Sequence, residues 1–173
     1  MAIGVLLAGS ICVSGGNMSG IPEITPSYVG FAPVVDGKVH DETWNLVPYV
    51  TGFELLGSAG PASQQTRMKM CYDRKNIYLM FECFEDRMDS LVTRFTEDHS
   101  PVWQDDSVEV FICPYAVAGE PRCHQFVVNA AGARAYIGPG LQKPPDTWRA
   151  AATGLPDRWV AEMSIPLDIL RPA

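Results

Sequence analysis

The stretch SPVWQDDSVEVFICP, residues 100–114, decides how the chain folds. Apolar residues at every second position from Val108 to Ile112 give the period of a β-strand with two different faces. Trp103 precedes this strand and Glu109 lies near its start. Such a pair suits a sugar, because a pyranose stacks its apolar face on a ring and bonds its hydroxyls to a carboxylate. The alternative is that the Trp closes one end of a β-sandwich.

Short strands with turn residues between them flank this stretch on both sides. The clearest are 66–72 and 77–84, which the polar turn at 73–76 joins into a hairpin. In the register that this turn sets, Cys71 faces Tyr78 and one core face carries Met68, Met70, Leu79 and Phe81. Further strands are expected at 50–56, 107–113, 123–130, 134–137, 148–153 and 158–165. About seven or eight strands and no long amphipathic helix predict an all-β fold, an antiparallel β-sandwich of the immunoglobulin or jelly-roll kind.

Composition and charge narrow the range of functions. The chain has 173 residues, enough for one domain with a substantial core, and 47% of them are hydrophobic. Its net charge of -7 repels phosphate backbones, so we expect no nucleic-acid partner. It contains no GxSxG, HExxH or P-loop motif. We therefore expect no catalytic activity.

The first 32 residues differ in composition from the rest of the chain. Residues 2–13 are apolar but too short to span a bilayer, and they resemble the apolar region of a secretory signal without its usual preceding positive charge. We expect a leader or signal-like segment at 1–19, with a disordered tail as the alternative. A linker rich in Gly, Ser and Pro follows at 20–32, and a single module occupies 33–173. The protein is then extracytoplasmic or secreted, without a membrane span.

Two further sequence features concern the core and the cysteines. Asp41 is expected to cap a short helical turn that carries Trp44 into the core. The chain has 5 cysteines without a zinc-site spacing. Cys71 does not face the cysteine at position 83 in the predicted hairpin, so no bridge is expected there. Cys113 and Cys123 are one candidate pair, and other pairs or none remain open.

Five blocks of sequence, in order, resemble family-nine-type carbohydrate-binding modules. The blocks are VVDGKV at 34–39 followed by Glu42 and Trp44, YDRKNIYL at 72–79, WQDDSVEVFI at 103–112, QFVVN at 125–129 and WVAEMSIP at 159–166. This resemblance implies a β-sandwich whose cleft holds the end of a glycan chain between two Trp rings. It implies that Trp103 is one ring, Glu109 the carboxylate and Asn129 an amide that bind an oligo- or polysaccharide in support of carbohydrate catabolism.

The chain departs from the family pattern at two places. Val127 stands where the family has an Arg, and the chain ends before the segment that carries the second Trp and the final strands. We therefore expect sugar binding to be weak or absent. We also expect an open strand edge, which a catalytic domain or a second copy of the chain would cover.

Other readings of the sequence stay open. The resemblance also fits a structural or vestigial appendage of a secreted or cell-surface protein that binds no sugar. A second alternative is a haem-binding domain of the same superfamily, which would use Met and His ligands. No cofactor is certain, but some family members hold structural calcium, and the acids here with suitable oxygen ligands are Asp86, Asp98, Asp105 and Asp106.

Overall fold

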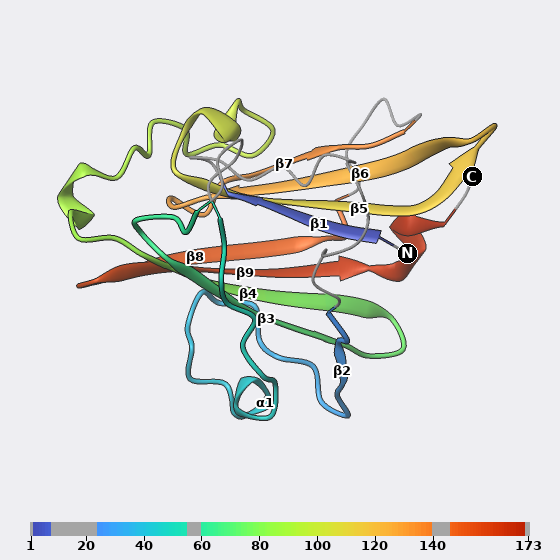
Figure 1. Ribbon diagram of the computed structural model, residues 1–173, viewed down its shortest axis with the longest axis horizontal. Coiled ribbons are helices and arrows are strands. Elements are labelled where there is room, and N and C mark those ends of the chain that lie inside the picture. The colour runs from blue at the N-terminus through green and yellow to red at the C-terminus, as the bar shows by residue number, and fades with distance from the viewer. Residues whose placement is uncertain (1, 8–23, 55–59, 140–145, 172–173) are drawn as a thin grey trace.

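Two β-sheets packed face to face make up the computed structural model, which describes residues 2–7, 24–54, 60–139 and 146–171 (Figure 1). Sheet A has the strand order β1-β5-β6-β7, formed by Ala2–Leu7, Ser107–Val117, Glu120–Asn129 and Arg134–Ile137. Sheet B has the order β2-β3-β4-β9-β8, formed by Ser27–Tyr28, Thr66–Tyr72, Asn76–Phe84, Arg158–Pro166 and Arg149–Leu155. All neighbours are antiparallel except β2 and β3. The predicted β-sandwich is confirmed.

The core lies between the two sheets and follows the predicted alternation of side chains. Val108, Val110 and Ile112 of β5 pack there against the hairpin of β3 and β4. That hairpin has the expected register, with Cys71 opposite Tyr78, and the side chains of Met68, Met70, Leu79 and Phe81 are all buried. The side chains between these positions therefore form the outer face of each sheet.

The predicted strand at 50–56 is wrong over its described part. Val50 and Glu54 form isolated bridges, to Met68 and Pro61 respectively, and no strand joins them. Gly52 lies between them with φ 83°, a backbone angle that does not continue an extended strand. Residues 55 and 56 lie outside the described part of the chain.

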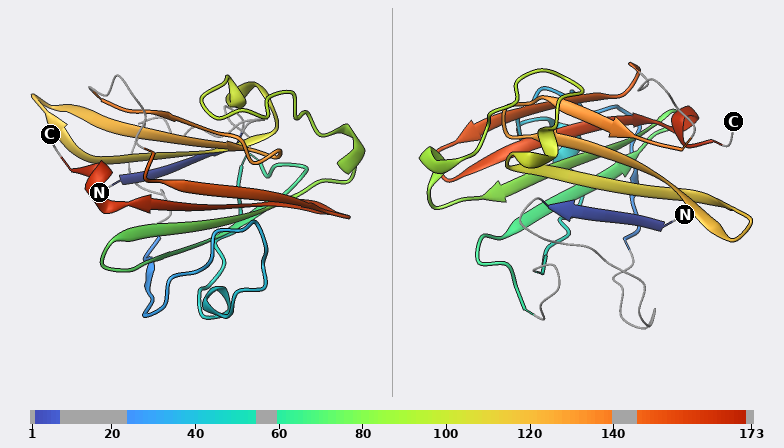
Figure 2. Two further views of the ribbon diagram at one scale, coloured as in Figure 1. Left: turned by 180° about the vertical axis from the view of Figure 1, so that it is seen from behind. Right: turned by 90° about the horizontal axis from the view of Figure 1, so that it is seen from above.

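Strand β1 lies antiparallel along β5, from the pair Ala2 and Cys113 to the pair Leu7 and Val108 (Figures 1 and 2). The start of the leader-like segment therefore supplies an edge strand of sheet A, and β5 has a partner on both sides. The rest of that segment, 8–19, lies outside the described residues. Its role as a leader stays a prediction.

A second apolar cluster on the far side of sheet B holds Trp44, as predicted. Asp41 caps the short helix α1, Glu42–Asn45, by accepting a hydrogen bond from the Thr43 amide at 2.8 Å. The Trp44 indole donates to Glu162 on β9 at 2.7 Å. This contact fixes the segment that enters the sandwich onto the outer face of sheet B.

The four cysteines in the described ranges form one bridge. Cys113 and Cys123 are bonded across β5 and β6, so this candidate pair is the one that forms. Cys71 and Cys83 are free and buried, and the expectation of no bridge between them is confirmed. Among the residues that the structure describes, no helix has the length and apolarity needed to cross a membrane.

Candidate functional site

The candidate site lies on the outer face of sheet A. Val108 and Val110 of β5 point into the core, so Ser107 and Glu109 between them face outward. On β6 the outward residues follow the same rule, because Phe126 and Val128 are core. The register sets Glu109 opposite Val127 and Ser107 opposite Asn129. Two of the three predicted site residues, Glu109 and Asn129, thus share one face.

The third predicted residue, Trp103, lies in the one-turn helix η2, Val102–Gln104, just before β5. Its neighbour Val102 is fully buried in a small apolar cluster with Val127, Ala133 and Ala135. Trp103 itself is 42% exposed. The Trp therefore does not close the sandwich, since Val102 does the packing. Val102 packs in the same cluster as Val127, and Val127 is paired with Glu109 in the neighbouring strand. The helix η2 therefore lies over the outer face of sheet A, close to Glu109.

Glu109 has a single hydrogen-bond partner in the described part of the chain. Its Oε2 accepts from Gln125 Nε2 at 2.5 Å, although only 7% of the residue is exposed. Burial raises the pKa of the Glu109 carboxyl, and the hydrogen bond from Gln125 offsets this only in part. Gln125 was not among the predicted site residues. The sequence signal for Gln125 is its position two residues before Val127, which puts it on the outward face of β6 beside Glu109.

Ser107 is a further polar residue that the sequence analysis did not single out. Its hydroxyl is buried and has no hydrogen-bond partner among the residues that the structure describes. It lies next to Glu109 on the outward face of β5 and near η2, because η2 ends three residues before it. A buried hydroxyl without a partner is costly, and this oxygen is also shielded from solvent, so a ligand reaches it only after neighbouring side chains move.

The amide of Asn129 is occupied within the protein. Its Nδ2 donates to the Phe95 carbonyl at 2.7 Å and to Asp105 Oδ2 at 2.9 Å, and its Oδ1 accepts from the Ala133 amide at 2.9 Å. The side chain is fully buried. Asn129 therefore holds the loop that leads to Trp103, and a direct contact with sugar stays a prediction.

Asp105 and Asp106 also hold the loop that carries Trp103 in place. Asp105 accepts hydrogen bonds from the Phe95 amide at 2.8 Å and from Arg94 Nε at 3.2 Å. Burial alone would raise its pKa, but these bonds and the one from Asn129 hold the pKa of Asp105 below its ordinary value. Asp106 Oδ2 accepts from the Val92 amide at 2.7 Å. The loop is thus fixed by charged and amide groups that the sequence places close to Trp103.

The two other acids named as calcium ligands also have protein partners. Asp98 pairs with Arg134 at 2.9 Å, and Asp86 accepts from Gln64 at 3.0 Å. Within the described ranges no group of three or more His, Cys, Asp or Glu side chains is arranged to hold a metal ion. Calcium binding stays a prediction.

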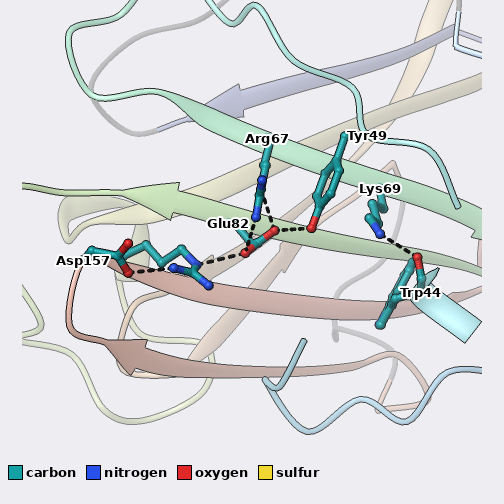
Figure 3. A network of polar contacts seen from close by, with 7 residues as sticks. Trp44, Tyr49, Arg67, Lys69, Glu82 and Asp157 are labelled. Carbon is teal, nitrogen blue, oxygen red and sulfur yellow. Dashed lines mark hydrogen bonds and ion pairs between the residues drawn. The ribbon is translucent and has the colours of Figure 1, made fainter. Parts of the chain in front are cut away.

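A second polar cluster lies on the outer face of sheet B (Figure 3). Glu82 is buried and accepts hydrogen bonds from Tyr49 at 2.5 Å, Arg67 at 2.7 Å and Arg158 at 2.9 Å. The Arg67 guanidinium and the Lys69 ammonium each lie 4.2 Å from the centre of the Tyr49 ring. Because these two cations lie over the Tyr49 ring, the ring has no free face on which a sugar could stack. The ion pairs of Glu82 with the two arginines link β3, β4 and β9 on this face.

Comparisons with known proteins agree with this architecture. Residues 35–168 match the model of a family described as "Carbohydrate family 9 binding domain-like". Two solved structures of a carbohydrate-binding module of family 9 from Caldicellulosiruptor kristjanssonii, one with cellotriose and one with glucose, are similar at 20% identity and TM-score 0.55. The alignment covers 82% of this chain and 67% and 69% of those chains.

A third solved structure shares the fold. It is described as a carbohydrate-binding protein from Bacteroides uniformis and has 20% identity and a TM-score of 0.53, with 73% of this chain and 63% of that chain covered. No curated protein matches the sequence. At this level of identity the solved structures establish the fold alone.

Proposed function

Because the chain belongs to the carbohydrate family 9 binding domain-like family, we propose that it is a non-catalytic module that binds oligo- or polysaccharide on the outer face of sheet A. The observation that carries this proposal is the half-exposed ring of Trp103 beside the face that holds Glu109. We propose that the module acts outside the cytoplasm as an accessory to carbohydrate catabolism. A catalytic domain or a second copy of the chain is its proposed protein partner.

The chemistry of the face suits a sugar ring. The exposed part of Trp103 offers an apolar surface on which the C–H face of a pyranose stacks. Glu109 Oε1 makes no hydrogen bond in the described residues and so is free to accept one from a sugar hydroxyl. Ser107 Oγ is a second polar group without a partner among the described residues on the same strand, but it lies beneath the surface. These groups stand in the mixed apolar and polar arrangement that small-ligand sites use.

The expected affinity is low. Stacking one sugar face on one ring removes roughly 50–80 Å² of apolar surface from water, which contributes about 1–2 kcal/mol. A charge-assisted hydrogen bond to Glu109 adds about 1.5–3 kcal/mol. A millimolar dissociation constant needs about 4 kcal/mol. The face therefore supports a dissociation constant in the millimolar range.

The similar structures suggest the first ligands to test. One contains cellotriose and one glucose, so chains of glucose units are the starting choice. A panel of cellotriose, xylotriose and a mannose trisaccharide would separate a general pyranose platform from one that selects among sugars.

A structural appendage without sugar binding is the second candidate function. The observation that favours it is the state of Asn129, whose amide is committed to Phe95, Asp105 and Ala133. In this reading the polar groups of the loop only hold the fold, and Trp103 contacts a neighbouring domain instead of a glycan.

Intrinsic Trp fluorescence separates the two candidates. Trp44, Trp148 and Trp159 are buried, so a change in emission on adding sugar reports mainly on Trp103. We expect a saturable shift with at least one oligosaccharide and its loss in Trp103→Ala. Phe31→Ala is the matched control, because Phe31 is an aromatic residue with 85% exposure outside this face. No shift up to tens of millimolar sugar in folded protein would refute the binding function.

A further inference from the structure

Four acidic side chains are buried in the described part of the chain, and each of three, including Glu162 with its raised pKa, has either an arginine or three hydrogen-bond donors as partners. Glu82 lies between two arginines, and Asp105 pairs with Arg94. Glu162 accepts hydrogen bonds from two backbone amides and an indole. Glu109 has one neutral partner, the amide of a glutamine. Glu109 is therefore the buried acid with the least compensation, and it lies in the candidate site.

No basic side chain of the described residues pairs with Glu109. Its cross-strand neighbour is Val127, which carries no charge. The arginines of the adjoining loop and of β7 are engaged elsewhere, because Arg94 holds Asp105 and Arg134 holds Asp98. The chain as a whole has a net charge of -7. The face around Glu109 thus contributes negative charge without a local cation.

Burying an ionised carboxyl without a cation is unfavourable, and burial accordingly raises the pKa of Glu109. A ligand that brings a positive charge to Oε1 relieves this cost, whereas a neutral hydroxyl relieves it only partly. A metal ion is a poor candidate, because hard cations need several oxygen ligands and this face offers one carboxyl. An ammonium group needs only a few acceptors and is attracted by an aromatic face as well.

We propose that this face selects amino sugars that carry a protonated amine, such as the glucosamine units of deacetylated chitin, over neutral sugars of the same length. The sugar ring stacks on Trp103, and its ammonium group donates to Glu109 while Gln125 holds the carboxyl in place. The proposal rests on the proposed sugar-binding function and names the ligand class of that site.

The test compares three trisaccharides by isothermal titration calorimetry on the folded chain: the glucosamine trimer, its N-acetylated form and cellotriose. The three have the same length. Acetylation removes the positive charge but adds an acetyl group, and cellotriose carries a small neutral hydroxyl at the same position, so the two neutral trimers together control for charge and size. We expect the glucosamine trimer to bind about tenfold more tightly than the other two, because an ammonium replaces a neutral hydroxyl as the donor to Glu109. The preference should shrink as salt rises.

Two variants locate the preference. Glu109→Gln should bring the ratio of the affinities for the glucosamine and acetylated trimers close to one. Glu120→Gln removes the same charge at an exposed position of the β5–β6 hairpin and should keep the ratio. If Glu109→Gln does not fold, comparing the free and acetylated trimers on the unmodified chain still shows whether the charged sugar is preferred.

The outcomes separate the two proposals. Equal binding of all three trimers, or tighter binding of a neutral one, overturns the amino-sugar preference and leaves the sugar-binding function standing. Binding of none of the three at tens of millimolar overturns both. A preference that survives in Glu109→Gln also overturns the inference, since the charge would then come from another group.

Discussion

Replacing Asn129 by Ala tests whether this residue holds the loop of Trp103. The change removes three hydrogen bonds at once, to the Phe95 carbonyl, Asp105 Oδ2 and the Ala133 amide. Two of these bonds are fully buried, those to Asp105 and Ala133. Ala offers no replacement for any of the three partners, and the two buried ones are shielded from water.

The magnitude follows from the number of buried groups that lose a hydrogen-bond partner. Each costs about 1–3 kcal/mol, so the two fully buried groups give a loss of about 2–6 kcal/mol in the free energy of unfolding. This is a large part of the roughly 5–15 kcal/mol that stabilises an ordinary domain. Asp105 keeps its bonds from the Phe95 amide and from Arg94, which limits the loss at that group.

Urea unfolding, followed by far-UV circular dichroism, measures the loss. We expect the transition midpoint of Asn129→Ala to fall by roughly 1–2 M with little change in slope. Asn45→Ala is the control, because Asn45 is exposed on α1 and its removal should change stability by less than about 0.5 kcal/mol. Trypsin should also cleave the variant faster at Arg94, which lies in the released loop. A loss below about 0.5 kcal/mol for Asn129→Ala would refute the assigned role.

Three further perturbations test other parts of the structure. The raised pKa of Glu109 means that the folded state holds this proton more tightly than the unfolded chain. The contribution of Glu109 to the free energy of unfolding is therefore present below the ordinary pKa of 4.5 and is lost as pH rises through the pKa of the folded state. Unfolding measured across this pH range should lack the decline in Glu109→Gln. A variant with the same pH profile as the unmodified chain contradicts this prediction. Reducing the bond between Cys113 and Cys123, which are 10 residues apart, should cost about 2–3 kcal/mol, read as a lower Tm with dithiothreitol; an unchanged Tm argues against the bridge. Glu82→Ala leaves Arg67 and a second arginine without their shared acceptor and should cost about 3 kcal/mol in chemical unfolding, whereas a loss under about 1 kcal/mol would show that water replaces Glu82 easily.

Local patterns were sufficient to predict most strands. The alternation from Val108 to Ile112 and the hairpin of Met68 and Leu79 are properties of neighbouring residues, and both were confirmed. The strand expected at 50–56 failed because one residue, Gly52, takes a backbone angle that composition does not reveal. The pairing of β1 with β5 joins segments about a hundred residues apart, and no local period encodes such a contact.

The candidate site was harder to predict for the same reason. The exposure of Trp103 depends on which residue of η2 packs against the sheet, and in this fold that residue is Val102. Asn129 finds its partners 34 and 24 residues away, so its commitment to the loop is visible only in the fold. The bond between Gln125 and Glu109 likewise depends on the register of β5 and β6.

The central claim is that carbohydrate binds to the outer face of sheet A. A two-dimensional ¹H–¹⁵N NMR titration of the labelled chain with the glucosamine trimer and cellotriose tests it most directly. We predict saturable shifts at the Trp103 indole and at the side-chain amide of Gln125, with the backbone of Glu109 moving in step and the Trp44 indole unchanged. Shifts confined to sheet B, or no shift at any of these groups in folded protein at tens of millimolar sugar, would contradict the account.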